Sequence, residues 1–341
     1  MRVIAAGLGS FGKSWAGIVR DGANTELVGV VEPHTENRAW GIANLGLPEE
    51  RIFPTIDEAL AGIECDAVLV VTPPETHLAV AAAALRAGKY VLVEKPLTPT
   101  LEEARAAIQE ADDAGKFLMV SQNYRFRGPA RAIQRLVREG AIGPLVSVSL
   151  NCQRDMRGYY EATNYRYLMR HPYVIDMSIH HFDQIRALTG ENAISIHARS
   201  WRVPDSPFRH DPSMAAMVTL ESGAPLLYQG SGATYRPLTS WNGDWELIGE
   251  EGKITWTGGV DDADGGEVML QCWGQEPVEI EGDRSGLQGR ELMLETFRQA
   301  VLTGQEPETN ARDNINSLAL VIACAASIDR GEPVQISEFV G

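Results

Sequence analysis

Three glycines that follow a short apolar segment constrain this chain more than any other feature. Residues 2–6 favour a β-strand and residues 10–20 favour a helix, so the glycines occupy the strand-to-helix turn. In that context the first glycine permits a tight turn, the second admits a pyrophosphate close to the backbone, and the third lets the helix pack on the strand. We expect this loop to bind a nucleotide cofactor through Gly7, Gly9, Ser10, Phe11 and Gly12.

The second predicted strand, residues 27–31, ends on an acidic residue. Glu32 lies 20 residues beyond Gly12, where a carboxylate can accept both hydrogen bonds of an adenosine ribose and repel a 2′-phosphate. This spacing favours NAD as the cofactor. The nearby Arg38 keeps NADP as an alternative, and a plain surface acid is the simpler interpretation of Glu32.

Three further apolar segments, residues 67–71, 91–94 and 117–121, alternate with helical patterns. Such alternation predicts a doubly wound parallel sheet, because parallel strands are joined by right-handed helical crossovers. We therefore expect a Rossmann domain over residues 1–122. At the ends of these strands we expect additional cofactor contacts from Thr72, Pro73, His77, Glu94 and Lys95.

The strand that ends at Glu94 is followed at once by Lys95 and Pro96. Strand ends carry functional groups in open α/β sheets, so a lysine there is placed to face the ligand crevice. A cis bond before the proline would fix the direction in which Lys95 points. The alternative is a solvated Glu–Lys pair at the surface.

The remainder of the chain, residues 123–341, shows a different order of predicted strands and helices. Most of its strand signals follow one another without intervening helices, which predicts an α+β domain with a large, mostly antiparallel sheet and one open face. An open face of this kind is often covered by another subunit, so we expect a homodimer or homotetramer. The expected strands are residues 146–150, 194–201, 214–220, 226–229, 245–248, 253–256 and 268–273, and the closing helices are residues 290–303 and 310–330.

A second group of candidate catalytic residues precedes most of these strands, in a helical segment after Tyr173. Asp176 and His180 are four residues apart and would share a helix face, where the carboxylate orients the imidazole and raises its basicity for proton transfer. Asp183 is expected to support His180, and His181 to be structural. A solvated helix face is one alternative; a metal site from the two aspartates and His180 is another, but it lacks a further His or Cys cluster, so we expect no metal.

Taken together, these motifs resemble those of the glucose-fructose oxidoreductase, inositol dehydrogenase and MocA-like (Gfo/Idh/MocA) family over nearly the whole chain. The motifs are the glycine loop, Thr72-Pro73 with His77, Glu94-Lys95-Pro96, Asp176 with His180, and the Gly249/Gly252 turn. The resemblance implies that Lys95 contacts nicotinamide and substrate, Asp176 holds the substrate hydroxyl and His180 is the acid/base. The chain departs from the family at residues 169–173, where bulky residues replace the glycine-rich segment that usually precedes this helix. Bulky residues there should narrow or reshape the substrate pocket, so the resemblance does not identify the substrate.

Substrate choice depends on the segment before that helix. It is rich in tyrosine and contains four arginines, Arg154, Arg157, Arg166 and Arg170, which suit a carboxylate, whereas tyrosines suit a sugar face. An acidic sugar is therefore one hypothesis, and a polar loop paired with acidic residues is the other. The expected substrate contacts are Lys95, Asn123, Arg157, Tyr160, Asp176 and His180.

The composition of the chain argues against two classes of binding partner. With 30 basic and 46 acidic residues among 341, the net charge of −16 argues against nucleic acid and anionic lipid as partners. The four scattered cysteines form no Cys-x-x-Cys pair and fit a cytoplasmic protein with reduced thiols.

The sequence thus predicts an NAD(P)-dependent oxidoreductase acting on a secondary alcohol of a sugar, polyol or sugar acid. Two alternatives stay open on the same fold. One is a glycosidase or epimerase that recycles its NAD, and the other is a nicotinamide-binding sensor without turnover.

Overall fold

The computed structural model describes residues 1–258, 265–282 and 286–340. It divides into two compact units, the first made of Met1–Asn123 and Gly289–Ile315 and the second of Tyr124–Gln288 and Asn316–Gly341. The predicted boundary placed residues 289–315 with the second domain, whereas the structure groups them with the first. The reason is long-range packing: Phe297 meets the ring of Phe117 edge-on at 5.9 Å, and the carbonyl of Thr309 accepts a hydrogen bond from Val120.

The first unit contains a six-stranded parallel sheet in the order β3-β2-β1-β4-β5-β6, which confirms the doubly wound prediction. Its central strands are apolar along their length because both faces are covered, and residues 67–70 and 91–93 are almost completely buried. The two-residue strand β3 was not anticipated. The strands are β1 (Arg2–Ala6), β2 (Glu26–Val31), β3 (Ile52–Phe53), β4 (Ala67–Val70), β5 (Tyr90–Glu94) and β6 (Leu118–Ser121).

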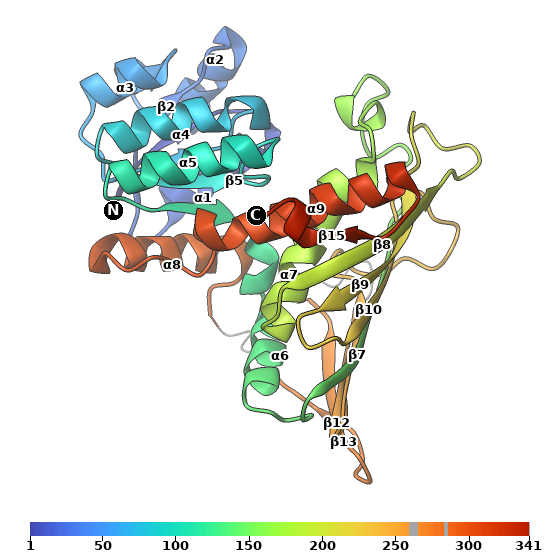
Figure 1. The fold of residues 1–341 in the computed structure, drawn as a ribbon. Helices are drawn as coiled ribbons and strands as arrows, with labels where there is room; N and C mark the ends of the chain where they lie inside the picture. The colour runs from blue at the N-terminus through green and yellow to red at the C-terminus, as the bar shows by residue number, and fades with distance from the viewer. Residues whose placement is uncertain (259–264, 283–285, 341) are drawn as a thin grey trace. The chain divides into compact units, whose positions relative to one another are not determined.

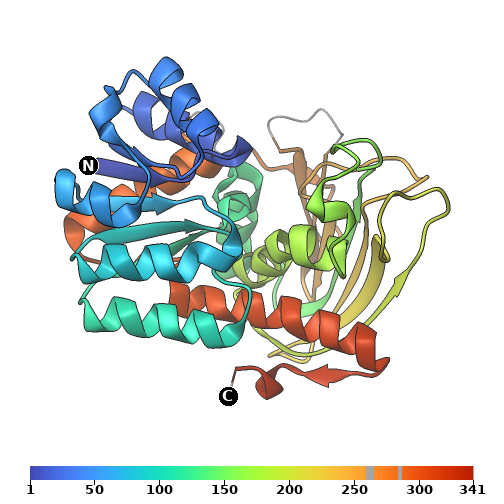
Figure 2. The same ribbon diagram turned by 90° about the horizontal axis from the view of Figure 1, so that it is seen from above.

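The helices of this unit cover both faces of the sheet. Strand order reverses between β1 and β4, so right-handed crossovers place α1 on one face and α4 on the other. Helix α8 packs beside α1, while α3, α4 and α5 pack in series, as Figures 1 and 2 show for α4 and α5. The bounds are α1 (Ser10–Asp21), α2 (Thr35–Asn44), α3 (Ile56–Gly62), α4 (His77–Arg86), α5 (Leu101–Asp113) and α8 (Gly289–Thr303).

The second unit is built on a nine-stranded sheet in the order β14-β13-β12-β11-β7-β10-β9-β8-β15. All pairs are antiparallel except β7 with β10, so the predicted mostly antiparallel sheet is confirmed. Its strands are β7 (Leu145–Gln153), β8 (Ala193–Trp201), β9 (Ser213–Leu220), β10 (Pro225–Ser231), β11 (Asp244–Gly249), β12 (Gly252–Thr257), β13 (Glu267–Cys272), β14 (Val278–Glu279) and β15 (Val334–Gln335).

Helices α6 (Gly128–Arg138) and α7 (Ile179–Thr189) pack together against one face of this sheet (Figure 1), and α9 (Ala311–Arg330) runs from the first unit into the second. On the opposite face alternate side chains are exposed. Met217 and Leu227 are 51% and 57% exposed, whereas their neighbours Val218 and Leu226 are fully buried. Strand alternation thus gives the second unit a wide, partly apolar open face.

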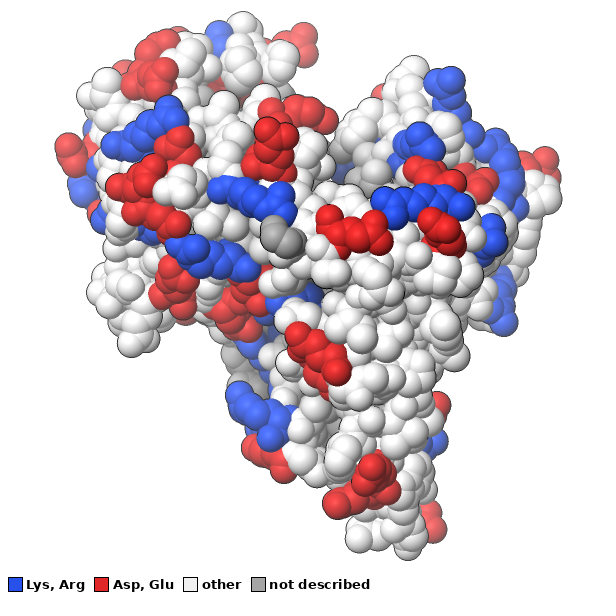
Figure 3. Space-filling view, in the orientation of Figure 1, with Lys and Arg blue, Asp and Glu red and all other residues white. Residues whose placement is uncertain are grey.

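Charged groups are mixed over the surface drawn in Figure 3, where acidic and basic side chains are interspersed. Within the described ranges, no helix is both long and apolar enough to cross a bilayer.

Candidate functional site

The glycine loop has the geometry of a nucleotide cradle. Gly7 has φ of 101°, and a Cβ on it would lie 2.5 Å from the carbonyl oxygen of Val71 at the end of β4. A Cβ on Gly12 would lie 2.2 Å from the carbonyl oxygen of Gly7, so both positions require glycine for packing. A Cβ on Gly9 would meet nothing within 4 Å. Gly9 therefore leaves open space beside the backbone at the start of α1, which fits a dinucleotide pyrophosphate.

Glu32 lies beside this loop at the end of β2 and is only 3% exposed. Its two carboxylate oxygens accept hydrogen bonds from the backbone N–H groups of Leu8 (2.7 Å) and His34 (2.9 Å). Each oxygen keeps a second acceptor position, which is what the two ribose hydroxyls require. The guanidinium of Arg38 is held close by, donating to the backbone carbonyls of Glu32 and Pro33.

His77 was expected to contact the cofactor, and the structure gives it a different task. The side chain is 1% exposed, and its Nε2 and Nδ1 lie 2.9 Å from the carbonyl oxygens of Thr72 and Pro96. The imidazole therefore ties together the segments that follow β4 and β5. We assign His77 a positioning role for Thr72, Pro73 and the Lys95–Pro96 turn.

Glu94 also faces the protein interior. Its carboxylate accepts hydrogen bonds from Trp15 Nε1 (2.6 Å), Ser121 Oγ (2.7 Å) and the backbone N–H of Lys95 (3.1 Å). These donors come from α1, β6 and the strand end itself, so Glu94 fixes the segment that carries Lys95. These bonds give Glu94 a supporting role, and its direct contact with the cofactor stays a prediction. The Lys95–Pro96 bond is cis.

Arg290 is a residue near the cofactor loop that sequence reasoning missed. It begins α8, 278 residues after Gly12, and its guanidinium lies over the rings of Phe11 (5.1 Å) and Trp15 (5.4 Å) and donates to Ser14. Burial lowers the pKa of Arg290, while the charge of Glu94 acts in the opposite direction. A single sequence offers no signal for this approach, because it arises from the packing of α8 on α1.

In the second unit, the segment with Asp176 departs from the regular helix that was expected. Residues Tyr173–Ser178 form a π-helical turn, and α7 begins at Ile179. Asp176 therefore lies in the wider turn and His180 in the first turn of the α-helix. Such π-bulges are frequent at functional sites, because they re-aim one side chain within a helix.

Asp176 pairs with an arginine from the preceding loop. Its carboxylate accepts from Arg166 Nε at 3.0 Å, and the guanidinium of Arg166 lies over the rings of Tyr160 (5.2 Å) and Tyr165 (4.8 Å). Burial, with the charge of Asp176 as the second cause, holds the pKa of Tyr160 well above its usual range. Arg166 therefore orients Asp176 beside a neutral tyrosine.

His180 is 7% exposed and stacks face to face on Tyr124, with ring centroids 4.2 Å apart and planes 8° apart. The guanidinium of Arg127 lies over the same tyrosine ring at 4.7 Å. Burial raises the pKa of Tyr124 to about 12, with smaller effects from Arg127, Cys152, Asp176 and Arg154. The imidazole is thus held in one orientation by a neutral aromatic ring. Asn123, the neighbour of Tyr124, is half-buried and ends the first stretch of the other unit.

The other polar residues of α7 are structural. His181 is completely buried, its Nε2 donates to the carbonyl of Trp241, and its Nδ1 accepts from Tyr228 at 2.5 Å. Burial lowers the pKa of His181 to about 4. Asp183 binds Arg125 and Ser317, so it forms an internal ion pair instead of the support for His180 that we expected.

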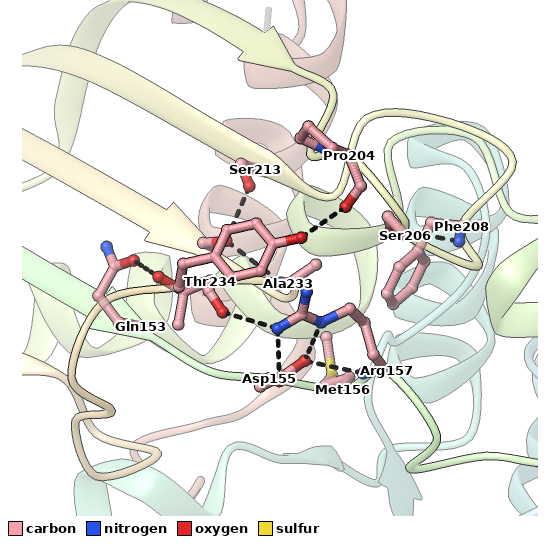
Figure 4. Close-up of polar contacts among 12 residues, drawn as sticks. Gln153, Asp155, Met156, Arg157, Pro204, Ser206, Phe208, Ser213, Ala233 and Thr234 are labelled. Atoms are coloured by element: carbon pink, nitrogen blue, oxygen red, sulfur yellow. Dashed lines mark hydrogen bonds and ion pairs between the residues drawn. The ribbon is translucent and has the colours of Figure 1, made fainter.

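Arg157, an expected substrate ligand, is engaged within its own loop. Figure 4 shows its guanidinium facing Asp155, with Nε and Nη2 each 2.8 Å from a carboxylate oxygen, and Nη2 also donates to the carbonyl of Thr234. The hydrogen bonds to Asp155 hold the pKa of Arg157 above its usual range. We therefore withdraw Arg157 as a substrate contact. Over the part of the chain that is described, no group of three or more His, Cys, Asp or Glu side chains is placed to hold a metal ion.

A Rossmann sheet with a nucleotide cradle, in a chain whose α+β unit carries Asp176 and the buried His180, defines the class of nicotinamide-dependent oxidoreductases. Comparison with family models agrees: residues 1–122 match the oxidoreductase family with an NAD-binding Rossmann fold, and residues 130–255 match the GFO/IDH/MocA C-terminal domain. The chain belongs to the Gfo/Idh/MocA family of oxidoreductases and carries an NAD-binding domain.

Named relatives share the chain's full length. It is 28% identical over 349 residues to D-apiose dehydrogenase of Paraburkholderia graminis, covering 98% of this chain and 89% of the relative. It is 27% identical over 351 residues to inositol 2-dehydrogenase of Rhizobium meliloti, covering 97% and 98%. An oxidoreductase of Agrobacterium radiobacter, solved with NAD⁺, L-tartaric acid and magnesium, shares the fold with a TM-score of 0.87 at 18% identity, and the match covers 99% of each chain.

Proposed function

We propose that the protein is an NAD-dependent dehydrogenase that oxidises a secondary alcohol of a sugar, a polyol such as an inositol, or a sugar acid. The observation that carries this proposal is His180, a buried imidazole held flat by Tyr124, four residues after an aspartate that Arg166 orients. The D-apiose and inositol dehydrogenases among the relatives support a sugar-like substrate.

In this proposal three side chains do the chemistry. Asp176 orients the substrate, and His180 accepts the hydrogen bond of the reacting hydroxyl and removes that proton as general base. Lys95 stabilises the negative charge that develops on the substrate oxygen. When bound, NAD supplies the hydride acceptor. Gly9 and Glu32 bind the cofactor, while Glu94 and His77 hold the segment that carries Lys95.

The test is turnover of a panel of polyols, inositols, aldoses and sugar acids by the NAD-loaded protein, followed by nicotinamide absorbance and by mass spectrometry of the substrates. His180→Ala and Lys95→Ala should each lower kcat by about a hundredfold or more. The exposed His210 provides a matched control, and His210→Ala should leave kcat unchanged. Normal turnover in His180→Ala would refute the assignment.

The same experiment separates the two alternatives. Altered substrate without reduced nicotinamide would show that the cofactor is recycled, as in a glycosidase or an epimerase. Cofactor binding with neither signal, unaffected by His180→Ala, would indicate a sensor.

We also propose that the open face of the nine-stranded sheet packs against a second copy of the chain, giving a homodimer or homotetramer. Exposed Met217 and Leu227 lie on adjacent strands, and their side chains are paired in register on this face. Covering them would remove apolar area from water. The cytoplasm remains the proposed location, which suits the four free cysteines.

A further inference from the structure

The four arginines of the loop before α7 differ in their partners. Three of them meet a carboxylate: Arg157 with Asp155, Arg166 with Asp176, and Arg170 with Asp329. Arg154 is the most buried of the four, at 8% exposure. Over residues 1–258, 265–282 and 286–340, no carboxylate lies within ion-pair distance of its guanidinium.

The surroundings of Arg154 hold the guanidinium in place without neutralising it. The group lies over the indole of Trp241, with its central carbon 4.1 Å from the ring centroid, and one terminal nitrogen, Nη1, donates to the carbonyl of Thr239. Its Nε is buried and has no hydrogen-bond partner among the described residues. A buried guanidinium with an unused donor is costly, so an anion that binds there would be strongly favoured.

Other arginines of this protein bind carboxylates through the Nε and Nη2 atoms of the guanidinium. Arg157 binds Asp155 through Nε and Nη2, and Arg125 binds Asp183 through the same two atoms. At Arg154 the bond to Thr239 uses Nη1, and on the Nε/Nη2 edge the buried Nε has no partner among the described residues. This edge presents two parallel N–H groups, which match the two oxygens of a carboxylate.

Arg154 is connected through Tyr124 and Trp241 to the helix that carries the proposed acid/base. The charges of Arg154 and Asp176 both act on the hydroxyl of Tyr124, the ring on which His180 is stacked. The indole that Arg154 covers belongs to Trp241, whose carbonyl accepts from His181, the residue after His180.

We propose that Arg154 binds a carboxylate of the substrate, so that the alcohol oxidised by this protein belongs to a polyhydroxy acid, such as an aldonic or uronic acid. The inference rests on the proposed function, since it places the carboxylate on the molecule whose hydroxyl faces His180. Arg154 then determines the preference for acidic substrates, and Arg166 stays paired with Asp176.

Binding tests this assignment without requiring turnover. Isothermal titration of the NAD-loaded full chain compares D-gluconate with D-glucitol and D-glucuronate with D-glucose, pairs that differ only where a carboxylate replaces a hydroxymethyl group. We expect at least one acid to bind about tenfold to a hundredfold more tightly than its neutral partner. Arg154→Met should abolish that preference, and the matched control Arg157→Met should keep it.

Arg154→Lys is the second variant, because it keeps the charge and the stem if the methionine variant does not fold. It should lose most of the preference, since a lysine lacks the two-pronged edge. Equal binding of acid and neutral partners by the wild type, or an unchanged preference in both Arg154 variants, would overturn the proposal. If the protein prefers acids but oxidises no compound, Arg154 keeps its assignment and the proposed dehydrogenase activity is refuted. If it oxidises neutral alcohols and shows no preference for acids, the dehydrogenase activity stands and the role of Arg154 is refuted.

Discussion

The imidazole of His180 lies nearly parallel to the ring of Tyr124, at 4.2 Å between centroids. The stack buries one face of the imidazole against a neutral aromatic ring. The geometry also fixes the ring plane, so the tyrosine acts as a positioning residue for the proposed base.

Replacing Tyr124 should therefore slow the reaction. In Tyr124→Leu we expect kcat to fall by about tenfold, because the imidazole is no longer held in one plane. Tyr124→Phe keeps the ring and should keep kcat. A loss of the same size in both variants would show that the hydroxyl, not the ring, is responsible.

Glu32 should determine cofactor preference. Its carboxylate is held by Leu8 and His34 beside the glycine loop, where it accepts from a ribose and repels a 2′-phosphate. Glu32→Gln should lower the ratio of kcat/KM for NAD over NADP by about tenfold or more. Adding Arg38→Met should cancel the gain in NADP use, because Arg38 is the cation held next to Glu32. An unchanged ratio would remove Glu32 from the cofactor site.

Arg290 should attract the negatively charged cofactor. Its guanidinium lies over Phe11 and Trp15, next to the loop that cradles the pyrophosphate. Arg290→Met should raise the KM for NAD by about tenfold and leave kcat nearly unchanged, as expected for lost uniform binding. The control is Arg298→Met on the same helix, whose guanidinium is already paired with Glu295. Equal effects of the two variants would contradict this role.

The buried His181 should make stability depend on pH. Its pKa is about 4 in the folded state and about 6.5 when unfolded, so only the unfolded state binds the proton between these values. The stabilisation is therefore present above pH 6.5 and is lost as the pH falls towards 4, by up to about 3 kcal/mol.

Urea unfolding between pH 7 and 4.5 measures this loss in the wild type and in His181→Gln, whose amide can replace both hydrogen bonds but does not titrate. The free energy of unfolding should fall less steeply in the variant. His34→Gln, on an exposed residue, should behave as the wild type. Parallel curves for the wild type and His181→Gln would show that His181 is not the responsible group.

The open sheet face should be the oligomer interface. Met217→Lys combined with Leu227→Lys should reduce the mass measured by light scattering to that of one chain, because two charges would be buried without partners. Leu302, 64% exposed on α8 in the first unit, provides the control, and Leu302→Lys should leave the mass unchanged. A double variant that keeps the wild-type mass would place the interface elsewhere.

Local patterns in the sequence were sufficient for most of the fold. The apolar runs at 67–70 and 91–93 indicated strands buried on both faces, and the alternation at 146–150 indicated a strand with one exposed face. Each strand residue is apolar or polar according to whether its side chain is buried, so the sequence pattern indicates which face of a strand is buried. The two-residue strand β3 was too short to show such a pattern.

What the sequence determined by itself is therefore most of the elements, the nucleotide loop and the spacing of Asp176 and His180. The partners of the charged residues were decided only by the tertiary structure: Arg157 pairs with Asp155, Arg290 lies over Phe11 from the far end of the chain, and the buried Nε of Arg154 has no partner among the described residues. The physical reason is that periodicity follows from neighbours along the chain. A salt bridge or a stacked ring depends on segments that meet only when the chain has folded.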